Sequence, residues 1–120
     1  EERTDTKKGN AKQKSSIREV VAYIEAHCTD YDLSLDMIAS QAQITPQYLC
    51  VKLKQEIGMS YKEYLTKLRI EEAKKLLMQE EISVNDVCQR VGYINVSYFI
   101  KIFQKYTGVT PTRYRAERQE

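Results

Sequence analysis

Two stretches of the sequence mix hydrogen-bonding, cationic and small apolar side chains at a spacing that places them on one side of a helix. The first set is Gln47, Cys50, Val51 and Lys54. The second set is Val96, Ser97, Ile100, Lys101 and Lys105. Such a mixture suits the major groove of DNA, where Ser and Gln bond base edges, Val meets thymine methyls and Lys reaches guanine or phosphate.

Catalysis and metal binding are poorly supported. The chain has one His and lacks a Gly-rich phosphate loop, so no catalytic set is assembled and we predict that it is not an enzyme. Cys28, Cys50 and Cys88 form no CxxC pair, and their odd number favours neither a disulfide framework nor zinc. His27 lacks further ligands at usable spacing, so we expect no metal and no cofactor. Cys50, expected to be exposed, is either a small filler in the groove or a redox-sensitive contact.

The composition is that of a cytoplasmic protein. The cysteine usage fits a reducing compartment, and no apolar run approaches the roughly 18 residues of a membrane-spanning helix, so no membrane partner is expected. Residues 1–14 hold no apolar side chain larger than Ala and are expected to form a polar tail or linker. The 120 residues then leave one compact domain over residues 15–120, or two very small ones.

Seven helices are expected, and the fold class is all-α. The first helix begins at the capping box of Ser16 and Glu19 and fades near His27. A first helix-turn-helix is expected over residues 34–58, a linker helix over 60–78, a second helix-turn-helix over 83–107 and a last helix over 110–118. Their starting caps are Ser34, Thr45 before Pro46, Ser60 with Glu63, Ser83, Asn95, and Thr110 before Pro111. The helix after Asn95 is expected to bury Phe99, Ile102, Phe103 and Tyr106.

The chain repeats itself. Leu33, Leu35, Ile38 and Ala39 match Ile82, Val84, Val87 and Cys88 at an offset of 49, and after the turn Tyr48-Leu49 matches Tyr98-Phe99 at an offset of 50. One extra residue therefore sits in the second turn. Each repeat is a short helix with a small inner residue, a tight turn and a longer helix, which is the helix-turn-helix plan.

Geometry allows both longer helices to reach DNA at once. A linker helix of roughly 19 residues is about 28 Å long, and the flanking elements bring the separation near ~34 Å, one turn of B-DNA. One chain would then read two successive major grooves and an asymmetric site.

The net charge of +2 hides an uneven distribution. Residues 15–43 carry −4 and residues 92–118 carry +4. We expect the basic second unit to supply most of the phosphate affinity, and the acidic first segment to face elsewhere or a partner.

The chain resembles a known family over about residues 17–115. The strings VGYINVSYFIKIFQKYTGVTPTRYR and ITPQYLCVKLKQEIGMSYKEYLTKLRIEEAKKLL are similar to the two helix-turn-helix units and linker helix of AraC/XylS transcription regulators. The RIEEAKKLL segment is especially similar to response regulators of the YesN type. The resemblance implies a bacterial C-terminal domain that binds double-stranded DNA and activates transcription through RNA polymerase, with an N-terminal sensory or receiver domain absent from this sequence.

The resemblance also implies which residues meet DNA. Base contacts are expected from Pro46, Gln47, Cys50, Val51, Val96, Ser97 and Lys101. Phosphate contacts are expected from Thr45, Lys54, Asn95, Tyr98, Lys105, Thr110 and Arg113, with Thr110 at a helix N-terminus that favours anions. Ile100 departs from a position that is often small and polar in the family, and Cys50 with Val51 replaces longer polar pairs. The first unit is therefore expected to specify bases weakly, by methyl contact and shape.

Several features have plainer interpretations. A helical protein-interaction module without DNA binding is the alternative function, favoured by the near-zero net charge and the acidic first segment. The tyrosines are expected to pack in the core with their hydroxyls at the surface. Glu71, Glu72, Lys74 and Lys75 are expected to form a solvated, paired face, and Arg69 to tie the linker helix to a neighbour.

Overall fold

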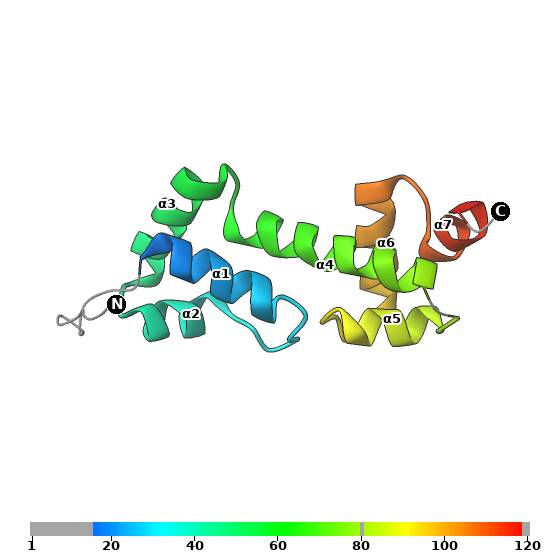
Figure 1. Ribbon diagram of the computed structural model, residues 1–120, viewed down its shortest axis with the longest axis horizontal. Coiled ribbons are helices and arrows are strands. Elements are labelled where there is room, and N and C mark those ends of the chain that lie inside the picture. The colour runs from blue at the N-terminus through cyan, green and yellow to red at the C-terminus, as the bar shows by residue number, and fades with distance from the viewer. Residues whose placement is uncertain (1–15, 80, 119–120) are drawn as a thin grey trace.

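The computed structural model describes residues 16–79 and 81–118, and these residues form seven helices without a strand. The expected polar tail, residues 1–14, lies outside the described residues. The helices are α1 (Ile17–His27), α2 (Leu35–Ala42), α3 (Pro46–Ile57), α4 (Tyr61–Gln79), α5 (Val84–Arg90), α6 (Val96–Thr107) and α7 (Pro111–Arg118). The all-α prediction is confirmed, and the long α4 runs between α1–α3 at one end and α5–α7 at the other (Figure 1).

Side-chain oxygens start the helices at the expected residues. Ser16 and Glu19 exchange two hydrogen bonds of 3.1 and 3.2 Å, and Ser60 and Glu63 do the same at the start of α4. Each bond satisfies a backbone N–H that has no partner inside the helix. A single side-chain oxygen caps each of five further helices, from Ser34, Thr45, Ser83, Asn95 and Thr110.

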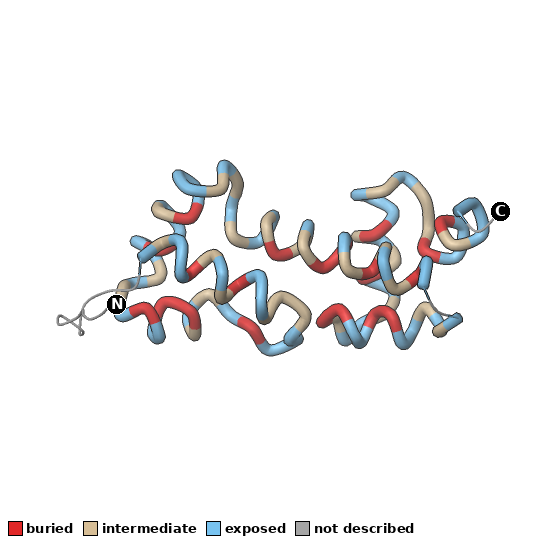
Figure 2. The backbone as a smooth tube through the Cα atoms, in the orientation of Figure 1, coloured by how far each residue is buried: buried red, intermediate tan, exposed pale blue. Residues whose placement is uncertain are grey.

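Two hydrophobic cores share α4 (Figure 2). The first core joins buried residues of α1, α2 and α3 to Leu65, and the second joins those of α5, α6 and α7 to Ile70, Ala73 and Leu77. The division falls between Leu65 and Ile70. Because each group of helices packs on its own half of α4, the domain is elongated, with extents of 54 × 28 × 23 Å.

The two turns follow the repeat found in the sequence. Ile44 N–H donates to the Ala39 carbonyl at 3.1 Å in the first turn, and Tyr93 N–H donates to the Cys88 carbonyl at 3.0 Å in the second. Ala39 and Cys88 are both buried, which lets the helices of each unit touch. Since Thr45 and Asn95 are equivalent caps, the extra residue of the second turn is Ile94.

Two details of α6 differ from expectation. Tyr106, expected in the core, is 44% exposed, because the last turn of α6 projects past the second core and lines a groove with Glu63 and Lys67. Val96 and Ile100, expected to face outward, are half-buried and pack against the second core. These side chains lie at the edges of the apolar face of α6, where the packing of the neighbouring helices determines how far each side chain is buried.

Replacing Phe103 by Ala should destabilise the domain by about 3–5 kcal/mol, because it opens a cavity in the second core. Phe103 is fully buried, and its ring centroid lies 5.9 Å from that of Phe99 and 5.5 Å from that of Tyr114. Urea denaturation followed by circular dichroism measures the loss. Tyr106→Ala, on the same helix but exposed, is the control and should cost much less. Equal losses would show that the core face of α6 is misassigned.

Candidate nucleic-acid interface

The outward face of α3 is set by its buried face. Leu49 and Leu53 are completely buried and hold the helix in one rotation on the first core. Four predicted contact residues therefore project into solvent, namely Gln47, Cys50, Val51 and Lys54. Val51 is 55% exposed. An apolar side chain in this position can contact the methyl groups of thymine. Pro46, also predicted to contact bases, is half-buried at the start of the helix.

The outward face of α6 is positioned in the same way. Phe99 and Phe103 are fully buried, and Ser97, Lys101 and Lys105 are exposed on the other side of the helix. Val96, a predicted base contact, is half-buried, so it offers less surface to a groove than its position suggested. The two faces lie at opposite ends of α4, and α3 and α6 extend from it with their C-terminal ends on the same side (Figure 1).

Three predicted phosphate contacts are the caps Thr45, Asn95 and Thr110. The Thr45 and Thr110 hydroxyls accept bonds of 3.1 and 3.2 Å from backbone N–H groups, and each keeps its own O–H to donate. The Asn95 Oδ1 accepts a bond of 2.9 Å from Tyr98 N–H, which leaves the amide NH₂ to donate. Each cap also stands at a helix N-terminus, where the helix dipole favours an anion.

Arg113 is exposed and forms a salt bridge within α7. Its Nε donates to Glu117 Oε2 at 2.8 Å on α7. The remaining N–H groups of the guanidinium can still reach a phosphate, because the fork has five donors.

A groove between α4 and α6 adds residues that the sequence analysis missed. It is lined by Lys62, Glu63 and Thr66 of α4 and by Tyr98, Ile102, Lys105 and Tyr106 of α6. Tyr98 and Lys105 were predicted to contact phosphate, whereas Lys62 and Thr66 belong to a helix treated only as a spacer. Only the fold brings these two helices together at this point, so no sequence signal was available for Lys62.

Tyr48 is a second missed residue, and here a signal existed. The repeat aligned Tyr48 with Tyr98, and the two side chains are 46% and 44% exposed. The Lys52 ammonium lies 5.9 Å from the Tyr48 ring centroid. Tyr48 therefore occupies on α3 the position that Tyr98 has on α6.

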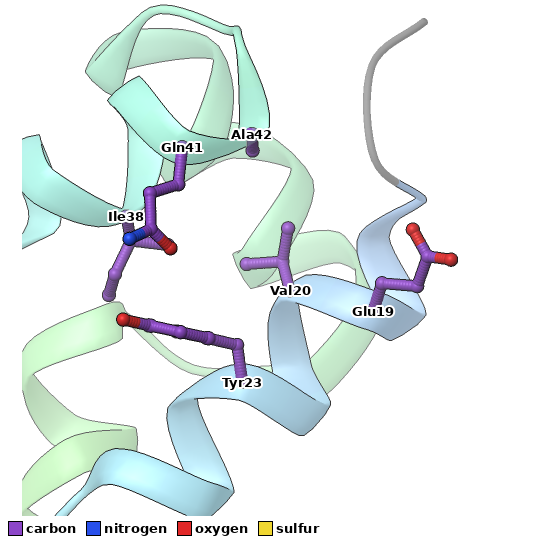
Figure 3. A pocket seen from close by; sticks show the side chains of 6 residues that line it. All are labelled: Glu19, Val20, Tyr23, Ile38, Gln41 and Ala42. Atoms are coloured by element: carbon purple, nitrogen blue, oxygen red, sulfur yellow. The ribbon is translucent and has the colours of Figure 1, made fainter. Parts of the chain in front are cut away.

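The surface of α1 and α2 has a different character. Five acids are exposed on or between these helices, namely Glu19, Glu25, Asp30, Asp32 and Asp36. A hollow of about 140 Å³ between the two helices is lined by Glu19, Val20, Tyr23, Ile38, Gln41 and Ala42 (Figure 3). Small-molecule sites are usually at least about 300 Å³, so this hollow is small for one.

The described residues contain neither a metal site nor a membrane span. Within the described part of the chain, His, Cys, Asp and Glu side chains form no group that could hold a metal ion. The helices of that part are all too short or too polar to cross a membrane.

Comparison with known proteins identifies the family. A helix-turn-helix domain model matches residues 38–117, a span that includes most of the first unit, all of α4 and the second unit. The chain belongs to the AraC family of helix-turn-helix transcription regulators. The resemblance found in the sequence is therefore confirmed, and the two exposed faces belong to an AraC-type DNA-binding domain.

Relatives of this AraC-type domain share most of its length. YtdP, an uncharacterized HTH-type transcriptional regulator of Bacillus subtilis, is 33% identical over 117 residues, which are 95% of this chain and 15% of YtdP. The C-terminal domain of AraT, a response regulator of Geobacillus stearothermophilus, is 38% identical with a TM-score of 0.82, covering 85% of this chain and 84% of that structure.

The expected similarity to YesN-type regulators is also confirmed. The C-terminal domain of the two-component response regulator yesN of Fusobacterium nucleatum is 32% identical with a TM-score of 0.79. That match covers 88% of this chain and 98% of the solved domain. The AraC-type chain spans from 15% to 45% of the length of eight curated relatives that it matches.

Cys50 should react with a thiol reagent before the other two cysteines. Cys50 is exposed, whereas burial raises the pKa of the Cys28 and Cys88 thiols and so lowers their thiolate fraction. Timed alkylation followed by peptide mass spectrometry measures the order. Cys50→Ser is the control and should remove the fast phase. Labelling of Cys50 that is no faster than that of Cys28 and Cys88 would show that the outward face of α3 is misplaced.

Proposed function

We propose that this AraC-family domain binds double-stranded DNA sequence-specifically, with α3 and α6 entering successive major grooves. The observation that carries the proposal is the pair of equivalent exposed faces, one at each end of α4. In the proposed complex, bases are contacted by Pro46, Gln47, Cys50, Val51, Val96, Ser97 and Lys101. Phosphates are contacted by Thr45, Lys54, Asn95, Tyr98, Lys105, Thr110 and Arg113.

The linker helix has a further part in this arrangement. When two recognition helices occupy successive major grooves on one side of a duplex, the minor groove between them faces the segment that joins them. Here that segment is α4, and its Lys62 and Thr66 share a groove with Tyr98 and Lys105. We therefore add Lys62 and Thr66 to the proposed phosphate contacts, together with Tyr48 on α3.

The regulatory role is proposed from the relatives. They are named as a transcriptional regulator or as regulatory proteins, and this chain spans less than half of their length. In the proposal the domain works in the cytoplasm of a bacterium as the C-terminal part of a longer response regulator. A sensory or receiver domain controls it, and contact with RNA polymerase activates transcription.

Protein binding is the second candidate function, favoured by the exposed acids of α1 and α2. These side chains repel phosphate but suit a basic protein surface. A salt titration of DNA binding itself separates the two functions. DNA binding requires cationic contacts whose counterions are released, so its affinity falls steeply as salt is raised.

Affinity for duplex DNA should fall with salt at a log–log slope of about −3 to −4. The proposed complex has four cationic phosphate contacts, from Lys54, Lys62, Lys105 and Arg113, and each adds about −0.9 to the slope. Fluorescence anisotropy over a range of KCl concentrations measures it. Lys62→Ala should reduce the slope by about one, and a slope near zero for the parent chain would contradict DNA binding.

Lys101→Ala separates base reading from phosphate binding at the centre of α6. If Lys101 reads a base, its loss should cost about 1–3 kcal/mol of binding free energy and relax the preference at one base pair. If Lys101 binds a phosphate, its loss should weaken binding to all sequences alike. Binding to a panel of duplexes that differ at single base pairs distinguishes the two. Lys75→Ala, which removes an exposed lysine of α4, is the control. If Lys101→Ala matches that control on every duplex, Lys101 does not contact DNA.

A further inference from the structure

Arg69 is the one charged side chain buried among the described residues, with 8% of its surface exposed. It lies on α4 between Leu65 of the first core and Ile70 of the second core. A buried charge is costly unless its donors are satisfied. Its position at the division between the cores therefore requires partners from the segments on either side.

The first partners come from the turn after α1. Arg69 Nε donates to the Cys28 carbonyl at 2.7 Å, and Nη2 donates to the Asp30 carbonyl at 2.8 Å. The Cys28 carbonyl ends α1, so it has no helical partner and carries part of the negative end of the helix dipole. Two bonds from one planar guanidinium fix the direction as well as the distance between α4 and this turn.

The second partners come from the turn between α5 and α6. The Arg69 Cζ lies 5.1 Å from the ring centroid of Tyr93, and the neighbouring Gly92 passes close to the guanidinium. A Cβ on Gly92 would lie 2.9 Å from Arg69 Nε and 3.0 Å from the Thr29 carbonyl oxygen. The turn between α5 and α6 therefore contacts both Arg69 and the backbone of the turn after α1.

These three segments form what we call the junction: residues 28–30, Arg69 and residues 92–93. The first segment leads through α2 to α3, and Tyr93 stands three residues before Val96, where α6 begins. A displacement at the junction is thus passed directly to both helices that carry the exposed faces. Without the junction, α4 alone would join the two cores, and a single helix can bend and rotate its ends.

We propose that Arg69 sets the distance and rotation between α3 and α6, and so determines which spacing of two DNA elements the domain accepts. This inference rests on the proposed function. Inserting one base pair moves the second element about 3.4 Å along the duplex and about 35° around it. With a rigid junction the domain should bind a duplex of altered spacing more weakly, whereas with a loosened junction its affinity should change little. Arg69 is a positioning residue, since its contacts are with the protein and not with DNA.

The test compares spacings with the 120-residue chain and its Arg69→Met variant. Duplexes selected from a random pool by the parent chain are remade with one base pair added or removed between the two elements. The parent should bind the selected spacing about tenfold or more tightly than either altered one, because a displaced second element loses its base contacts and a mismatch at even one base pair costs about tenfold. Arg69→Met should reduce that ratio to less than about threefold while binding a duplex with a single element as the parent does.

Controls separate positioning from stability. Arg115→Met also removes an arginine that donates to a backbone carbonyl, from Nε to Leu77 at 3.1 Å, but that bond ties α7 to the second-core half of α4. It should keep the parental spacing ratio. Arg69→Lys keeps the charge but cannot hold both carbonyls in one plane, so its ratio should fall between those of the parent and Arg69→Met. Circular dichroism checks that each variant is folded at the assay temperature.

A second readout needs no DNA. Spin labels at Cys50 and at an introduced Ser97→Cys, in a Cys28→Ala background, report the distance between the two exposed faces. The distribution should be narrow with Arg69 and broad with Arg69→Met. A narrow distribution in both, or an unchanged spacing ratio in folded Arg69→Met, overturns the inference. If the parent selects no duplex at all, the proposed function fails and the spacing role fails with it, even where the label distances differ.

Discussion

The Arg69 guanidinium holds together three segments that are far apart in the sequence. Its burial imposes conditions on each of them. The turn after α1 must present two carbonyls in one plane, and the turn before α6 must approach closely enough for Tyr93 to cover the guanidinium. Gly92 follows from the same condition, because its φ of +106° and the 2.9 Å approach to Arg69 Nε both exclude a side chain. A charge that would destabilise an apolar core thereby becomes a directional link between two cores.

Each helix-turn-helix depends on α4 for its own stability. Half of this chain is near the size at which a hydrophobic core can barely stabilise a fold. The helix α4 adds apolar side chains to the core of each half. Leu65 serves the first core, and Ala73 and Leu77 serve the second. The same helix also carries Lys62 into the groove beside α6. One element thus supplies packing, spacing and a proposed contact surface.

Much of the fold was predictable because it is encoded locally. Capping residues such as Ser16 and Asn95 act within three residues of their own position, and the internal repeat showed that the two units share one plan. The outward faces of α3 and α6 followed from periodicity, with errors at the edges. Tyr106 was placed in the core but is exposed, and Val96 was placed outside but is half-buried. Periodicity states which side of a helix is apolar, but it does not state how far the neighbouring helix extends.

The sequence by itself determined the seven helices, the two turns, the family resemblance and most of the residues proposed to face DNA. The tertiary structure decided how the two units are joined, because the contacts of Arg69 with Cys28 and Asp30 span 41 and 39 residues. It also placed Lys62 beside α6 and showed that the acids of α1 and α2 form a surface of their own. Helix caps and periodicity act over a few residues along one chain segment. The orientation of one recognition helix relative to the other depends on contacts between distant segments, which only the folded chain brings together.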